Sequence, residues 1–138
     1  MTVIVRDDGF HAEDFTADWI AFGELSGEDH DGLAVTLSSD TKPESLTAVL
    51  PRLSAVRVEF PAFSDGRGFT IGKELRRLGF AGRLRAAGHV IADQYAMVRR
   101  VGFDEVEISA DLAARQPADQ WRFRSDWRAH DYLSRLRG

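Results

Sequence analysis

The sequence predicts an α/β fold built from four consecutive strand–helix units, with a parallel sheet and right-handed crossovers. The prediction rests on two observations: four short strand-like segments recur along the chain, and apolar residues at helical spacing follow each of them. The four segments span residues 33–37, 55–60, 83–87 and 105–109. Four such units are half of an eight-stranded barrel, so we expect a half-barrel-like arrangement.

Residues 1–32, before the first unit, are expected to form an N-terminal arm that packs on the main body. The segment Thr2–Arg6 is typical of a short strand, and an aromatic segment, Phe10–Phe22, follows it. The acidic stretch Gly23–Gly32 contains three glycines, which is typical of a polar loop.

Each strand of the βα core, 33–115, is followed by a predicted helix. The first begins at Thr41, with Pro43 at an early position where its missing N–H costs little. The second ends at Gly79, the third ends before Gly102, and the fourth begins near Asp111. The apolar residues that carry the helical spacing are Leu46, Val49, Leu50, Leu53, Ile71, Leu75, Leu78, Ile91, Tyr95 and Val98.

Residues 116–138 form a predicted C-terminal arm rich in aromatic residues. Trp121, Phe123, Trp127 and Tyr132 are interleaved with five arginines. Such interleaving can stack on nucleic-acid bases. In an acidic chain it favours instead an arm that packs on the body or docks a protein partner, because Trp, Tyr and Arg are the usual interface anchors.

Length and composition exclude several classes of protein. The 138 residues predict a single domain, 1–138, and the net charge of -4 argues against general binding to nucleic acid or anionic membranes. No apolar run approaches the roughly 20 residues of a membrane-spanning helix, and no signal peptide is evident, so we expect a cytoplasmic protein. The absence of cysteine excludes disulfides, a thiol nucleophile and a thiolate-held iron–sulfur cluster.

The predicted strands alternate apolar and charged residues, although buried parallel strands usually read as continuous apolar runs. This period of two places a polar row, Glu59, Arg85 and Glu107 together with Thr36, on one face of the sheet. The row is either a solvated or subunit-covered face with weak cross-strand ion pairs, or the interior of a half-barrel. In the second case it would line a site or a dimer seam, so we expect a homo-oligomer.

The loop after the second strand is the first candidate site, because ligands of parallel α/β folds bind at the carboxyl ends of the strands. Here Asp65, Gly66, Arg67 and Gly68 precede a helix whose free N–H groups and Arg67 charge can attract an oxyanion or a partner carboxylate. The alternative is a tight turn in which Asp65 caps the helix and Arg67 pairs with a neighbouring acid. A dinucleotide site is disfavoured, because strand three ends without an acidic ribose anchor.

The end of the third strand supplies the second candidate site. His89 lies at the strand end, a common position for an acid/base catalyst, and Asp93 and Gln94 occupy the first turn of the next helix. The alternatives are a loop histidine that forms hydrogen bonds and an aspartate that favours the positive end of the helix dipole. No histidine is spaced for metal binding with another, so no metal site is predicted, and no flavin or nicotinamide motif identifies a cofactor.

Several of these segments resemble a bacterial family of unknown molecular function that is often labelled a probable oxidoreductase of sulfite reduction. The resemblance covers about residues 33–109. It is carried by Phe60-Pro-Ala-Phe-Ser-Asp-Gly-Arg-Gly68, Leu75-Arg76, Gly82-Arg-Leu-Arg-Ala-Ala-Gly88, Asp93-Gln94 and Arg100-Val-Gly-Phe-Asp104. It implies a role in cytoplasmic assimilatory sulfate and sulfite reduction, and it supplies no catalytic residue.

Three functional hypotheses follow. The first is a non-redox accessory protein that binds sulfite reductase, its electron donor or a small oxyanion. The second is a small enzyme, an oxidoreductase with a borrowed cofactor, whose site combines Asp65, Arg67, His89, Asp93 and Gln94. The third is a homo-oligomeric scaffold whose charged sheet face is a subunit seam.

Overall fold

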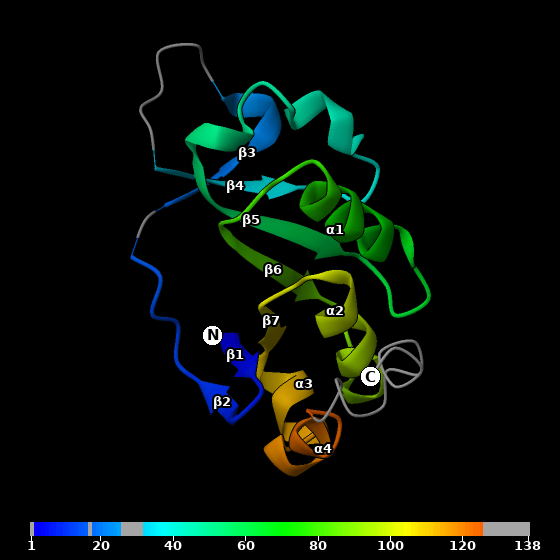
Figure 1. Ribbon diagram of the computed structural model, residues 1–138. Coiled ribbons are helices and arrows are strands. Elements are labelled where there is room, and N and C mark those ends of the chain that lie inside the picture. The colour runs from blue at the N-terminus through cyan, green and yellow to red at the C-terminus, as the bar shows by residue number, and fades with distance from the viewer. Residues whose placement is uncertain (1, 17, 26–31, 126–138) are drawn as a thin grey trace, which may run out of the picture.

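The computed structural model describes residues 2–16, 18–25 and 32–125, which form a seven-stranded sheet with helices packed against one face (Figure 1). The strands lie in the order β2-β1-β7-β6-β5-β4-β3. Their bounds are β1 (Thr2–Arg6), β2 (Gly9–His11), β3 (Trp19–Ala21), β4 (Leu33–Leu37), β5 (Leu53–Phe60), β6 (Arg83–Gly88) and β7 (Glu105–Ser109). In this part of the chain no helix has the length and apolar character needed to cross a membrane.

The predicted parallel strands are present, but the sheet is larger and mixed. Strands β3 to β7 run parallel in consecutive order, whereas β1 pairs antiparallel with both β7 and β2. The predicted N-terminal arm therefore contributes three strands: β1 and β2 extend one side of the sheet, and β3 forms the opposite edge. Val3 and Val5 pair with Ile108 and Val106, so β1 continues the apolar face of β7.

The prediction of four strand–helix units is wrong for the first unit. Two short 3-10 turns, η2 (Pro43–Leu46) and η3 (Leu50–Arg52), connect β4 to β5 in place of an α-helix. Pro51 explains the difference, because a proline inside a helix removes one hydrogen bond and clashes with the preceding turn. The spacing correctly identified core residues, since Leu46, Leu50 and Leu53 are all buried. These residues lie on consecutive 3-10 turns and at the start of β5, not on one α-helix.

The other connections are helical. They are α1 (Arg67–Arg77), η4 (Ala92–Gln94) leading into α2 (Tyr95–Val101), and α3 (Ala110–Arg115) followed by α4 (Ala118–Phe123); a 3-10 turn, η1 (Phe22–Glu24), follows β3. Helices α1 and α2 end where the sequence predicts, because Gly79 and Gly102 adopt positive φ angles of 101° and 118°. The helices cover the apolar set of the strands, including Val56, Leu84 and Val106, which are all fully buried.

Two glycines let α1 approach the sheet. A Cβ added at Gly68 would lie 2.4 Å from the Phe60 ring, and one added at Gly72 would lie 2.5 Å from the Phe103 ring. The rings of Phe60 and Phe103 pack edge to face, 5.9 Å apart. The helix therefore rests directly on two core phenylalanines.

Replacing Gly72 with valine should lower the free energy of unfolding by about 1–3 kcal/mol despite the higher helix propensity of valine, because the added carbons overpack the core at Phe103. Lys73→Val is the matched control, since Lys73 is exposed on the same helix. Urea denaturation of both variants measures the difference. Equal loss in the two variants would contradict the close packing of α1.

Candidate functional site

The sheet face opposite the helices, here called the charged face, carries two rows of side chains set by strand register. One row consists of Thr36, Arg57, Arg85 and Glu105. The next row places Ala87 between Glu59 on β5 and Glu107 on β7. The sequence predicted a single polar row, but its members lie in two rows. Thr36 and Arg85 belong to the first, and Glu59 and Glu107 belong to the second, which crosses β6 at Ala87, two residues after Arg85.

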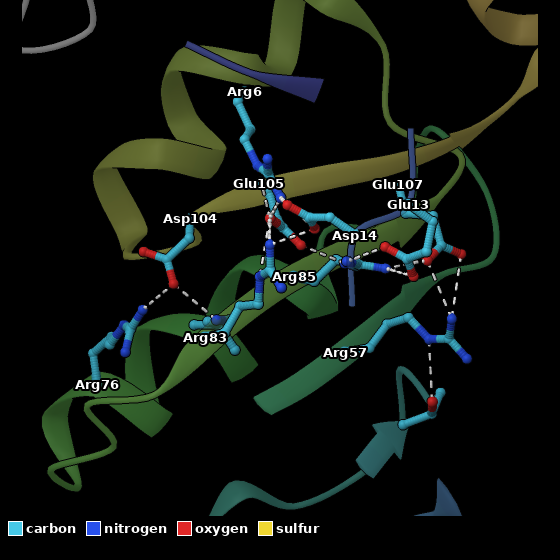
Figure 2. Close-up of polar contacts among 12 residues, drawn as sticks. Arg6, Glu13, Asp14, Arg57, Arg76, Arg83, Arg85, Asp104, Glu105 and Glu107 are labelled. Carbon is cyan, nitrogen blue, oxygen red and sulfur yellow. Dashed lines mark hydrogen bonds and ion pairs between the residues drawn. The ribbon is translucent and has the colours of Figure 1, made fainter. Parts of the chain in front are cut away.

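Arg85 lies at the centre of the charged face and its side chain is fully buried (Figure 2). It donates from Nε to Glu105 at 2.6 Å, from Nη1 to Glu107 at 2.7 Å, and to both carboxylate oxygens of Glu13 at 2.7 Å. Burial alone would lower the pKa of Arg85, but the three carboxylates outweigh it and the pKa is raised. The sequence predicts a cross-strand ion pair at this position, but it does not predict that the pair is completely removed from solvent.

The N-terminal segment between β2 and β3 covers this part of the charged face. Asp14 pairs with Arg6 at 2.8 Å and with Arg83 at 2.9 Å, and both arginines also reach Glu105 (Figure 2). Hydrogen bonds from Arg6 hold the pKa of Asp14 well below its usual range. Hydrogen bonds from Arg85 likewise lower the pKa of Glu13. The cover over Arg85 is thus the chain's own segment.

Aromatic side chains of this segment and of β3 stack on the arginines beneath them. The Trp19 ring lies 4.7 Å from the guanidinium carbon of Arg57 and 5.1 Å from that of Arg85. Phe15 lies 5.4 Å from the guanidinium carbon of Arg83. Cation–π contacts of this kind hold the planar guanidinium groups in fixed orientations.

Beyond this cover, the charged face contains a cavity of about 360 Å³ at the carboxyl ends of β5 and β6. Its lining residues are Thr36, Arg57, Glu59, Phe60, Pro61, Ala87, Gly88, His89 and Glu107. Arg57 is held in place, because its Nε donates to Thr36 Oγ1 at 3.1 Å and its Nη1 donates to Glu107 at 3.1 Å. The cavity joins two predicted candidates that come from different parts of the sequence analysis, Glu59 of the polar row and His89 of the strand end.

Arg67 of the first candidate loop is already neutralised by its neighbour. It pairs with Asp65 at 2.6 Å and donates to Ser39 Oγ at 2.8 Å. Hydrogen bonds from Arg67 lower the pKa of Asp65 to about 2. Gly68 lies against the Phe60 ring, where it serves packing. The contacts match the alternative of a tight turn, although Arg67 also borders an open depression of about 500 Å³ near Lys42.

His89 remains exposed at the end of β6. Its Nδ1 lies 3.3 Å from the carbonyl oxygen of Phe60, and its ring packs edge to face against Phe63. The tautomer that donates Nδ1–H to this carbonyl leaves Nε2 as an acceptor. His89 borders the cavity on the charged face and also a smaller one of about 140 Å³ beside Leu112 and Arg115.

The two polar residues after His89 have separate structural partners. Asp93 pairs with Arg124 at 3.0 Å. Gln94 accepts a hydrogen bond from the Ile91 N–H and donates one to the Phe63 carbonyl oxygen, both at 3.0 Å. Gln94 thus ties the loop after β5 to the loop after β6. None of these contacts joins Asp93 or Gln94 to Asp65 or Arg67.

Among the described residues, three large apolar side chains are exposed, and we call them the carboxyl-edge patch: Phe63 in the loop after β5, Met97 in α2 and Phe123 in α4. Phe63 is linked to η4 through Gln94, and Phe123 adjoins Arg124, which pairs with Asp93. Met97 lies in α2, the helix that follows η4. Phe63 is 42 % exposed, Met97 53 % and Phe123 76 %.

Sequence reasoning singled out Phe123 in the C-terminal arm but missed Phe63 and Met97. Phe63 follows Pro61 and Ala62, and Met97 stands between Ala96 and Val98, so the sequence does not distinguish them from core residues. Only the tertiary fold shows that neither is covered. Of the other aromatic residues named in the arm, Trp121 is fully buried, and Trp127 and Tyr132 lie outside the described residues.

A protein-family model described as "Bacterial protein of unknown function (DUF934)" matches residues 34–131. No curated protein and no solved structure matches the chain.

Proposed function

The chain belongs to this bacterial family of unknown function, and we propose that it is a non-redox accessory protein of assimilatory sulfite reduction that binds the reductase or its electron donor. The pathway is suggested by the sequence resemblance given above. The non-redox role is favoured because the chain has no cysteine to hold an iron–sulfur cluster.

The observation that carries the proposal is the carboxyl-edge patch. Exposed Phe and Met side chains near an arginine are the composition of a protein interface core, in which aromatic residues, Met and Arg are enriched. Arg124 is 43 % exposed beside Phe123, and its guanidinium lies 5.3 Å from the Phe123 ring. A protein partner that buries Phe63 and Phe123 would gain binding energy from both.

A protein partner is favoured over a small oxyanion at the predicted loop. The positive charge of Arg67 is taken up by Asp65, and Asp40 adds a further negative charge nearby. An oxyanion would have to compete with the Asp65 carboxylate for the same donors.

Sedimentation velocity of the protein mixed with its organism's sulfite reductase, and separately with the electron donor of that enzyme, tests the proposal. We expect a complex with one of the two. Phe63→Ser and Phe123→Ser should each weaken it at least tenfold, about 1.4 kcal/mol, because central aromatic residues dominate interface energies. Lys73→Ser, an exposed change on α1, is the control.

Two results would remove the proposal: no complex with either protein, or a complex that both serine variants form as tightly as the unchanged chain. The protein sedimented alone reports its oligomeric state in the same experiment. If it self-associates and both serine variants are monomers, the patch joins copies of this chain, whereas the scaffold hypothesis places the subunit seam on the charged face.

A further inference from the structure

We propose that the cavity on the charged face binds a small organic cation, specifically a primary amine with an apolar body. No residue of the carboxyl-edge patch lines this cavity, so this inference is independent of the partner-binding proposal.

The charges around the cavity select a cation. Glu107 receives hydrogen bonds from both Arg57 and Arg85, so its charge is compensated. Glu59 is exposed in the cavity wall, and the described residues give it no hydrogen bond and no ion pair. With a neutral histidine, the cavity lining therefore carries one surplus negative charge, that of Glu59.

The shape of the cavity follows from strand register. Ala87 lies between Glu59 and Glu107 on neighbouring strands, so its methyl group leaves an opening between two carboxylates. Strands are about 4.8 Å apart, which separates the two glutamate backbones by roughly 9.6 Å. A volume of about 360 Å³ falls within the range of small-molecule sites.

The walls are already organised for a ligand. Arg57 is fixed by Thr36, Glu107 and the Trp19 ring, so it cannot swing toward Glu59 without losing these contacts. His89 Nε2, as an acceptor, can receive a second hydrogen bond from an ammonium group that binds Glu59. Pro61 supplies an apolar surface for the body of the ligand.

Benzylamine, benzyl alcohol and benzoate test the charge preference, because they share one shape and differ in charge. Amide chemical shifts of Ala87 and Gly88, followed by NMR, report occupancy of the cavity. We expect benzylamine to saturate these shifts and to bind at least tenfold more tightly than the other two. No binding of benzylamine, or equal binding of benzoate, would overturn the proposal.

Three variants locate the site. Glu59→Gln, an isosteric change at an exposed side chain, should weaken benzylamine at least tenfold, and Ala87→Leu should abolish binding by filling the cavity. Glu44→Gln is the matched control, because Glu44 is exposed in η2 and does not line this cavity. Benzylamine binding that survives Glu59→Gln at full strength would place it elsewhere and refute the assignment, whether or not Ala87→Leu folds.

Discussion

Replacing Arg85 with methionine should lower the free energy of unfolding by about 3–5 kcal/mol, because it leaves the Glu105 carboxylate buried without its closest cation. Glu105 is 1 % exposed and cannot recover the lost interaction from water. Arg6 and Arg83 still reach its other oxygen at 3.1 Å, so the carboxylate keeps part of its compensation.

Urea denaturation measures the loss, with Arg77→Met as the control. Arg77 pairs with Glu74 at 2.7 Å, a distance like those at Arg85, but it is 67 % exposed. Exposed pairs contribute about 0–1 kcal/mol, so the control should lose no more than that. An equally small loss at Arg85 would contradict its buried position.

A double variant separates two contributions to the stability loss: the cost of leaving the Glu105 carboxylate buried without Arg85, and the net stabilisation by the ion pair itself. Arg85→Met combined with Glu105→Leu should recover at least half of the stability lost by Arg85→Met, because an apolar pair replaces a buried ionic one without leaving a charge. The other two partners tolerate the change: Glu107 keeps Arg57, and Glu13 is partly exposed. A double variant as unstable as the single one would show that the network acts through Glu13 and Glu107.

The alternation of charged and apolar residues was sufficient to predict the two faces of the sheet. Val56, Val58 and Phe60 are buried under the helices, whereas Arg57 and Glu59 lie on the opposite face. Alternation does not give the register between strands. For that reason the sequence did not show that Ala87 separates Glu59 from Glu107, which is the fact that creates the cavity.

The N-terminal segment is the largest departure from the sequence prediction. It was expected to pack on the body, and it does so through ion pairs with residues distant in the sequence, Asp14 with Arg83 and Glu13 with Arg85. Glu13 and Arg85 are 72 residues apart, so no local spacing links them. Arg85 is a charged residue in the middle of a strand whose other residues are mostly apolar. Such a residue is the feature of the sequence that could have indicated a further layer of chain over that face.

The candidate site was predicted in part. His89 and Glu59 border one cavity, although their proximity depends on the pairing of Phe60 with Gly88 across β5 and β6. Arg67 and Asp93 each have a close ionic partner, Asp65 two residues away and Arg124 in α4. The first partner was visible in the sequence. The second required the fold of α4 onto η4.

Replacing Trp121 with alanine should lower the free energy of unfolding by about 3–5 kcal/mol, a typical cost of deleting a large buried aromatic side chain. Trp121 is fully buried, its Nε1 donates to the Gln116 carbonyl oxygen at 2.9 Å, and its ring packs edge to face on Tyr95 at 6.0 Å. Tyr95 in turn donates to Asp7 at 2.6 Å, so α4 is joined through the core to the end of β1.

Phe123→Ala is the control for this experiment, because Phe123 lies two residues further on in the same helix and is 76 % exposed. It should change stability by no more than about 0.5 kcal/mol. A small loss at Trp121 as well would mean that α4 does not belong to the folded core. The expected contrast assigns the two aromatic residues different roles: Trp121 stabilises the domain, and Phe123 can be replaced without unfolding it. Loss of partner binding in Phe123→Ser would then report on the interface itself.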